Sequence, residues 1–157
     1  MNRSNFFKSY PEAPEEVSAS NTIARMLDGL GYRLYWTLHG LREEDCDYKP
    51  CEGAKSIYEI IWHILGLVNW LYMHVYGHQM KRPKNIIDQG HETLRVLEEL
   101  RRSFIEMEDK DLPNYKLEDR PFWRFINMPI SDALHHVGQV GILRRAAGNP
   151  VVMEGNR

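Results

Sequence analysis

Apolar residues recur along the chain at steps of three and four, which is the period of an α-helix. The first such stripe consists of Ile23, Met26, Leu27, Leu30, Leu34, Leu38 and Leu41. Gly40 and the charged stretch 42–45 follow it, and residues of these kinds commonly end a helix. The pattern therefore predicts a helix from Asn21 to Leu41.

A second helix is predicted from Ile57 to Tyr76, where apolar residues occur nearly all round the helical circumference. Ser56 and Glu59 have the spacing of a capping box at its start, and Gly77 interrupts the pattern at its end. A helix that is apolar all round either lies at the centre of a fold or also faces a second subunit.

Two further helices are predicted toward the C-terminus. One runs from Asp88 to Met107, and the other begins near Pro129 and ends at Gly148. The proline-containing stretch 108–128 between them is predicted to be a long, partly packed loop.

Four helices of this length predict an all-α protein with the architecture of a four-helix bundle. The chain of 157 residues has room for one such domain, which we place at residues 19–151. Residues 1–18 are then an N-terminal extension, and residues 152–157 are a C-terminal tail.

Composition and charge exclude several classes of partner. Twenty Lys and Arg against 22 Asp and Glu give a formal charge of −2, which argues against a nucleic-acid partner. The most apolar run, residues 57–72, is too short and too polar to span a membrane. The first residues lack the apolar core of a signal peptide, so we expect a cytoplasmic protein. Cys46 and Cys51 match no common zinc or redox spacing and are interpreted as ordinary loop thiols.

Three polar residues stand on helices that otherwise supply apolar core. His63 lies in the middle of the most apolar helix, and Asp132 and His136 lie four residues apart in the last one. Because four residues span about one helical turn, Asp132 and His136 rise from the same face. If His63 meets them from a facing helix, two imidazoles and one carboxylate come together. This donor set suits a divalent ion of zinc, iron, nickel or manganese and leaves positions open for water or substrate.

Simpler interpretations of each residue stay open at this point. His63 is explained equally well as a buried neutral histidine, Asp132 as a residue capping a helix start, and His136 as a surface or core histidine. His135 is rotated by about 100° from His136 and is a poor substitute ligand. His74 and His78 are also four residues apart, but they lie at a helix end that favours positive charge.

Two segments of the chain resemble the DinB-like (YfiT-type) superfamily of metal-binding four-helix bundles. They are LREEDCDYKPCEGAKSIYEIIWHILG and DALHHVGQVGILRRAAGNPV, and the likeness extends over about residues 20–151. The resemblance places two of the family's three ligand histidines at His63 and His136. The third position, a histidine in the family, is Asp132 in this chain.

The resemblance implies a metal-dependent activity on small molecules. Some members look like transferases that use a low-molecular-weight thiol such as bacillithiol or mycothiol, and a relative isomerises maleylpyruvate. We therefore expect a thiol S-transferase or a hydrolase, with a small-molecule substrate or thiol as partner and catalytic residues that the sequence does not identify. The alternative is a non-catalytic, stress-associated bundle or binding module whose metal site is vestigial. A homodimer is also expected, because the second helix is apolar nearly all round and bundles of this family often pair.

Overall fold

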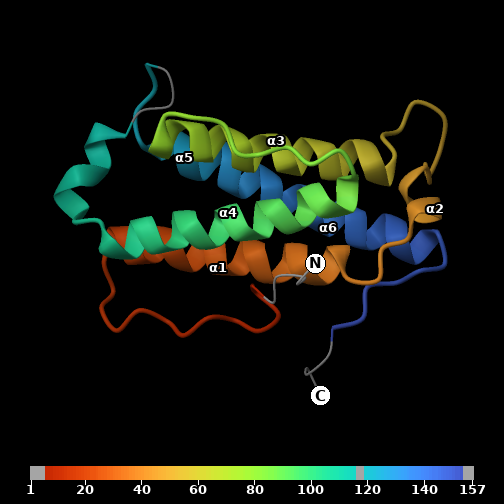
Figure 1. Cartoon of the computed structure of the whole chain (residues 1–157), viewed down its shortest axis with the longest axis horizontal. Helices are drawn as coiled ribbons and strands as arrows, with labels where there is room; N and C mark the ends of the chain where they lie inside the picture. Colours follow the sequence, from red (N-terminus) through yellow and green to blue (C-terminus); the bar gives the residue numbers. More distant parts are fainter. Residues whose placement is uncertain (1–5, 116–118, 154–157) are drawn as a thin grey trace.

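Four long helices account for about half of the chain in the computed structural model, which describes residues 6–115 and 119–153 (Figure 1). They are α1 (Ala19–Leu38), α3 (Ile57–Tyr76), α4 (Ile86–Glu106) and α6 (Ser131–Ala146). The shorter elements are α2 (Glu43–Cys46), the 3-10 helix η1 (Asp109–Asn114), α5 (Trp123–Phe125) and the π-helix η2 (Ile126–Ile130). The described residues contain helices and no β-strand, so the predicted all-α class is confirmed.

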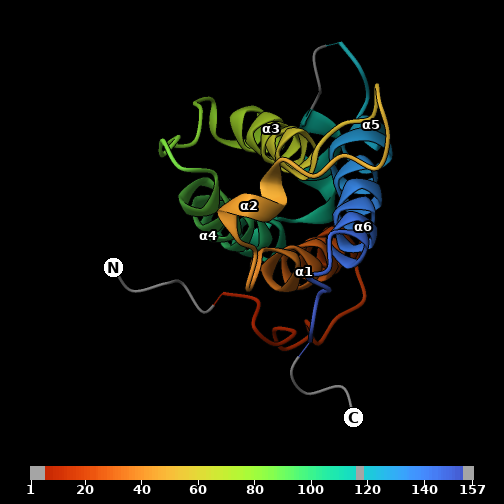
Figure 2. The same ribbon diagram turned by 90° about the vertical axis from the view of Figure 1, so that its right-hand side faces the viewer.

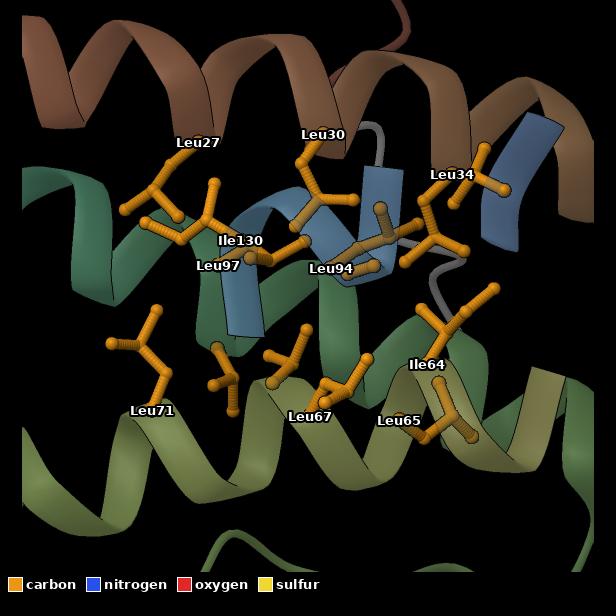
Figure 3. Close-up of a cluster of buried hydrophobic side chains, with 14 of the residues drawn as sticks. Leu27, Leu30, Leu34, Ile64, Leu65, Leu67, Leu71, Leu94, Leu97 and Ile130 are labelled. Atoms are coloured by element: carbon orange, nitrogen blue, oxygen red, sulfur yellow. The ribbon is translucent and has the colours of Figure 1, made fainter. Parts of the chain in front are cut away.

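The four long helices surround one apolar core. Helices α1 and α3 each pack against both α4 and α6, and Figure 2 views the bundle from one end, with α6 inclined to the other three helices. Figure 3 shows leucines from three of these helices pointing into the shared interior, among them Leu27, Leu30, Leu34, Leu67, Leu71, Leu94 and Leu97. Each fully buried leucine contributes about 1.5–3 kcal/mol relative to an exposed one. Ala133, Val137 and Val140 of α6 belong to the same buried cluster, so the core holds α3 and α6 in a fixed relation to each other.

The bounds of α3 agree with the sequence prediction because local interactions set them. The Ser56 Oγ accepts a hydrogen bond from the Glu59 N–H at 3.2 Å, and the Ser56 N–H donates to Glu59 Oε2 at 2.7 Å. At the other end, Gly77 adopts a left-handed conformation with φ 76°. The predicted capping box and the predicted glycine stop are both confirmed.

Part of the apolar surface of α3 is covered by the chain that follows it. The segment 77–85 runs back along α3 before α4 begins (Figure 1). Met80 of this segment is buried, and its backbone N–H donates to the Asn69 Oδ1 of α3 at 3.0 Å. The surplus apolar surface that led us to expect a homodimer is thus used in part within one chain. The homodimer itself stays a prediction.

The region predicted as a long loop at 108–128 contains helical structure, and this part of the prediction is wrong. Helix η1 lies near its start, and the helical backbone that leads into α6 begins at Trp123 rather than near Pro129. Pro129 lies inside η2, where the Ser131 N–H reaches back to the Ile126 carbonyl. A proline ring clashes with the carbonyl four residues earlier in an α-helix, and a π-turn relieves this clash by widening the backbone locally.

The predicted N-terminal extension packs against the helices over residues 6–18. The Phe7 side chain is buried against Gly31, and the Tyr10 ring stacks on Tyr32 with 4.3 Å between centroids. Asp28 is fully buried in α1 and forms ion pairs with Arg25 and Arg101. These two arginines also donate hydrogen bonds to the backbone carbonyls of residues 11 and 12. Residues 6–18 are therefore attached to the helices through Phe7, Tyr10 and the two backbone carbonyls, although most of the side chains in this segment are exposed.

The loop cysteines differ from each other in their surroundings. Cys46 lies in α2, which the sequence analysis did not predict, and it is buried, while Cys51 is exposed. Both are free thiols, and burial raises the pKa of the Cys46 thiol.

Among the helices that the structure describes, none combines the length and the apolar character needed to cross a membrane.

Candidate metal centre

The three predicted ligand residues meet along the seam between α3 and α6. His63 lies in the second turn of α3, and Asp132 and His136 lie one turn apart in α6. The two helices pack side by side, so residues that are far apart in sequence face each other across the seam (Figures 1 and 2). One donor atom from each of the three residues lies within 4.8 Å of the other two.

The Asp132 carboxylate lies between the two imidazoles and presents one oxygen to each. His63 Nε2 is 3.3 Å from Asp132 Oδ2, and His136 Nε2 is 3.5 Å from Asp132 Oδ1. The two imidazole rings are nearly perpendicular, with 4.7 Å between their centroids. Two donors that each lie about 2.1 Å from one ion at a tetrahedral angle are about 3.4 Å apart. The two observed contacts are close to this spacing, but they involve different oxygens of Asp132, and the three donor atoms of the group lie within 4.8 Å of one another. Binding one ion would draw these donors closer together.

Two of the three side chains in the triad are partly exposed to solvent. The side chains of His63 and Asp132 are 39% and 38% exposed, whereas that of His136 is 15% exposed. Protein ligands that leave part of the coordination sphere accessible are typical of catalytic rather than purely structural metal sites. The same exposure argues against the interpretation of His63 as a fully buried neutral histidine.

The capping interpretation of Asp132 does not agree with the structure. Ile130, directly before α6, is itself helical, and helical backbone extends back to Trp123. Asp132 therefore does not stand at the free start of a helix, where a carboxylate would satisfy unpaired N–H groups. Its carboxylate is directed at His63 and His136 instead.

His135 lies outside the triad, as the helical rotation predicts. Its side chain is exposed, and its Nε2 accepts a hydrogen bond from Gln139 Nε2 at 2.9 Å. The other end of the same amide, Gln139 Oε1, lies 2.7 Å from His136 Nδ1. The sequence analysis missed Gln139 as a site residue, although its place three and four residues after the two histidines puts it on their side of the helix.

The second histidine pair makes separate contacts. His74 Nδ1 lies 2.8 Å from the Trp70 carbonyl oxygen, and His78 Nε2 lies 3.3 Å from the Tyr72 hydroxyl. Within residues 6–115 and 119–153, the triad is the one group of three or more histidine, cysteine or acidic side chains whose donors converge.

Comparison of the chain with protein-family models, with curated proteins and with solved structures gives no match. The metal centre is therefore inferred from the geometry and donor chemistry of these residues.

Proposed function

We propose that this chain binds one divalent transition-metal ion through His63, Asp132 and His136. The supporting observation is the convergence of three donor atoms, from two separate helices, to within 4.8 Å of one another. Helical spacing alone accounts for the proximity of Asp132 to His136. It does not account for His63, which is 69 positions away from Asp132 in sequence and still contacts it.

The donor set supports an ion of the zinc, iron, nickel or manganese class. Ions of this class accept imidazole nitrogens and carboxylate oxygens as ligands. Three protein ligands leave at least one coordination position open. We further propose that the four long helices form a bundle of the DinB-like type. In that assignment Asp132 takes the place of a histidine and adds a negative charge to the ligand set.

For the activity, we propose metal-dependent chemistry on a small molecule, either S-transfer from a low-molecular-weight thiol or hydrolysis. A bound divalent ion lowers the pKa of a coordinated thiol or water and so supplies a nucleophile near neutral pH. The chain's own part is to hold the ion through two ring nitrogens and one carboxylate. The partial exposure of His63 and Asp132 admits a small molecule to this side of the seam.

Metal analysis tests the proposal directly. Protein purified without a metal-affinity tag should contain close to one equivalent of a transition metal per chain. After the metal is removed, calorimetric titration with zinc and with nickel should show one site. The His136→Ala variant should lose binding, because two remaining protein ligands seldom retain a transition metal against water. The neighbouring His135→Ala variant changes a histidine outside the triad and should keep most of the affinity.

The substitution Asp132→His tests the ligand position that distinguishes this chain. It restores the set of three histidines usual in the family that the chain resembles, and it should tighten zinc binding. Binding that survives His136→Ala but not His135→Ala would show that the ligand register is wrong. If neither the wild type nor Asp132→His binds zinc or nickel, the proposal fails, and the chain is better interpreted as a non-catalytic binding module.

A further inference from the structure

Gln139 links the ring of a proposed ligand to the ring of a histidine outside the triad. Its side-chain oxygen lies 2.7 Å from His136 Nδ1, and its side-chain nitrogen lies 2.9 Å from His135 Nε2. All three residues belong to the rigid helix α6, and Gln139 itself is half-buried. One primary amide therefore bridges two imidazoles.

The two ends of an amide have different hydrogen-bonding roles, and this difference determines where the ring protons lie. A carbonyl oxygen only accepts, so the proton on a neutral His136 ring is on Nδ1 and is donated to Gln139. The lone pair of that ring is then on Nε2, the atom that faces Asp132 Oδ1 at 3.5 Å. A charge-assisted hydrogen bond to a carboxylate is shorter, about 2.7–2.9 Å, so the longer distance fits two acceptor atoms with no hydrogen between them.

His135 is the second partner of the amide. An amide nitrogen only donates, so His135 Nε2 is the acceptor and its own proton is on Nδ1. If the amide turned over, its NH₂ group would point at His136 Nδ1 and its carbonyl would point at His135. In that arrangement His135 would donate from Nε2 and His136 would accept at Nδ1, so the orientation of this one amide couples the tautomers of the two rings.

We propose that Gln139 is a positioning residue that holds His136 in the Nδ1–H tautomer, with its Nε2 lone pair ready for a metal ion. This inference rests on the proposed function, since the ion is the one bound by the triad. Histidine ligands of metals generally donate their second ring N–H to a partner outside the coordination sphere. Loss of such a partner typically lowers metal affinity by about 10–100-fold.

Three substitutions and a control separate this role from a purely structural one. Gln139→Leu removes both ends of the amide, whereas Gln139→Glu keeps an oxygen acceptor for His136. His135→Ala leaves the amide in place without its second partner. Gln89→Leu is the matched control, since Gln89 is a buried glutamine of α4 whose amide donates to the Pro83 carbonyl and not to a histidine.

Two measurements are made on each protein. The first is calorimetric titration of the metal-free protein with zinc. The second is long-range proton–nitrogen correlation NMR of ¹⁵N-histidine-labelled, metal-free protein at about pH 8, where a free imidazole is neutral and its tautomer can be assigned. We expect His136 to be the Nδ1–H tautomer in the wild type and a mixture of tautomers in Gln139→Leu. Zinc affinity should fall by about 10–100-fold in Gln139→Leu. Gln139→Glu and Gln89→Leu should stay within about threefold of the wild type, and His135→Ala should lose less than Gln139→Leu.

The outcomes distinguish this inference from the proposed function. If the wild type binds zinc and Gln139→Leu binds it equally well, the positioning role is overturned while the metal site stands. An Nε2–H tautomer of His136 in the metal-free wild type overturns it as well, whatever the affinities are. If the wild type binds no zinc, the proposed function fails first and removes the role with it.

Discussion

The buried carboxylate of Asp28 is expected to be a principal stabilising group of this fold. Its side chain is fully buried in α1 and forms ion pairs with two arginines. Arg101 of α4 contacts it at 2.5 Å and is only 13% exposed, whereas Arg25 contacts it at 2.9 Å and is 42% exposed. The same arginines donate to backbone carbonyls of the N-terminal segment, Arg25 to Pro11 and Arg101 to Glu12.

The substitution Asp28→Ala should destabilise the protein by about 3–5 kcal/mol, because it leaves the largely buried Arg101 guanidinium without its counter-charge. Domains are typically stable by about 5–15 kcal/mol, so this loss is a large fraction of the total. For a chain of this length each kcal/mol lowers the melting temperature by about 2–4 °C, which predicts a decrease of about 6–20 °C. Arg25→Ala is the matched control and should cost less than about 1 kcal/mol, since the arginine that it removes is well exposed to solvent.

Urea unfolding followed by far-UV circular dichroism measures these differences, and an unchanged dependence on urea concentration would show that the same structure unfolds. Limited proteolysis gives a second reading. Cleavage within residues 6–18 should be faster in Asp28→Ala, because the arginines that hold this segment lose their common anchor. An Asp28→Ala variant within about 1 kcal/mol of the wild type, or no less stable than Arg25→Ala, would refute the reasoning.

Three other predictions follow from the structure. The buried Asp45 carboxylate is paired with Arg42 at 2.6 Å, which lowers its pKa well below the usual range. The stabilising effect of this carboxylate is therefore complete above about pH 4 and is lost as the pH falls further. The urea concentration at the midpoint of unfolding, measured from pH 7 to pH 2.5, should decline less in Asp45→Asn than in the wild type. A Cβ at Gly31 would lie 2.6 Å from Phe7 ring atoms. Gly31→Ala should thus destabilise the wild type, yet stabilise a Phe7→Ala background by about 0.5–1 kcal/mol, as a double-mutant unfolding cycle would show. The expected homodimer predicts that sedimentation at micromolar concentration gives about twice the 18.5 kDa chain mass, and a clean monomer would contradict it.

Features set by neighbouring residues were predictable from the sequence alone. The bounds of α3 depend on Ser56, Glu59 and Gly77, whose effects act within one helical turn, and the predicted bounds agree with the structure. The shared face of Asp132 and His136 follows in the same way from the helical period. The all-α class follows from the three- and four-residue apolar period, and the helices of the described residues confirm that class.

Features set by packing between distant segments were decided only in the tertiary structure. The contact of His63 with Asp132 requires that α3 and α6 lie side by side, in a register that the shared core determines. The return of residues 77–85 along α3 likewise depends on what that segment packs against. A local pattern shows which side of a helix is apolar, but it does not show which helix will cover that side. For that reason the sequence predicted the three candidate ligands one helix at a time, and the fold brought their donor atoms together.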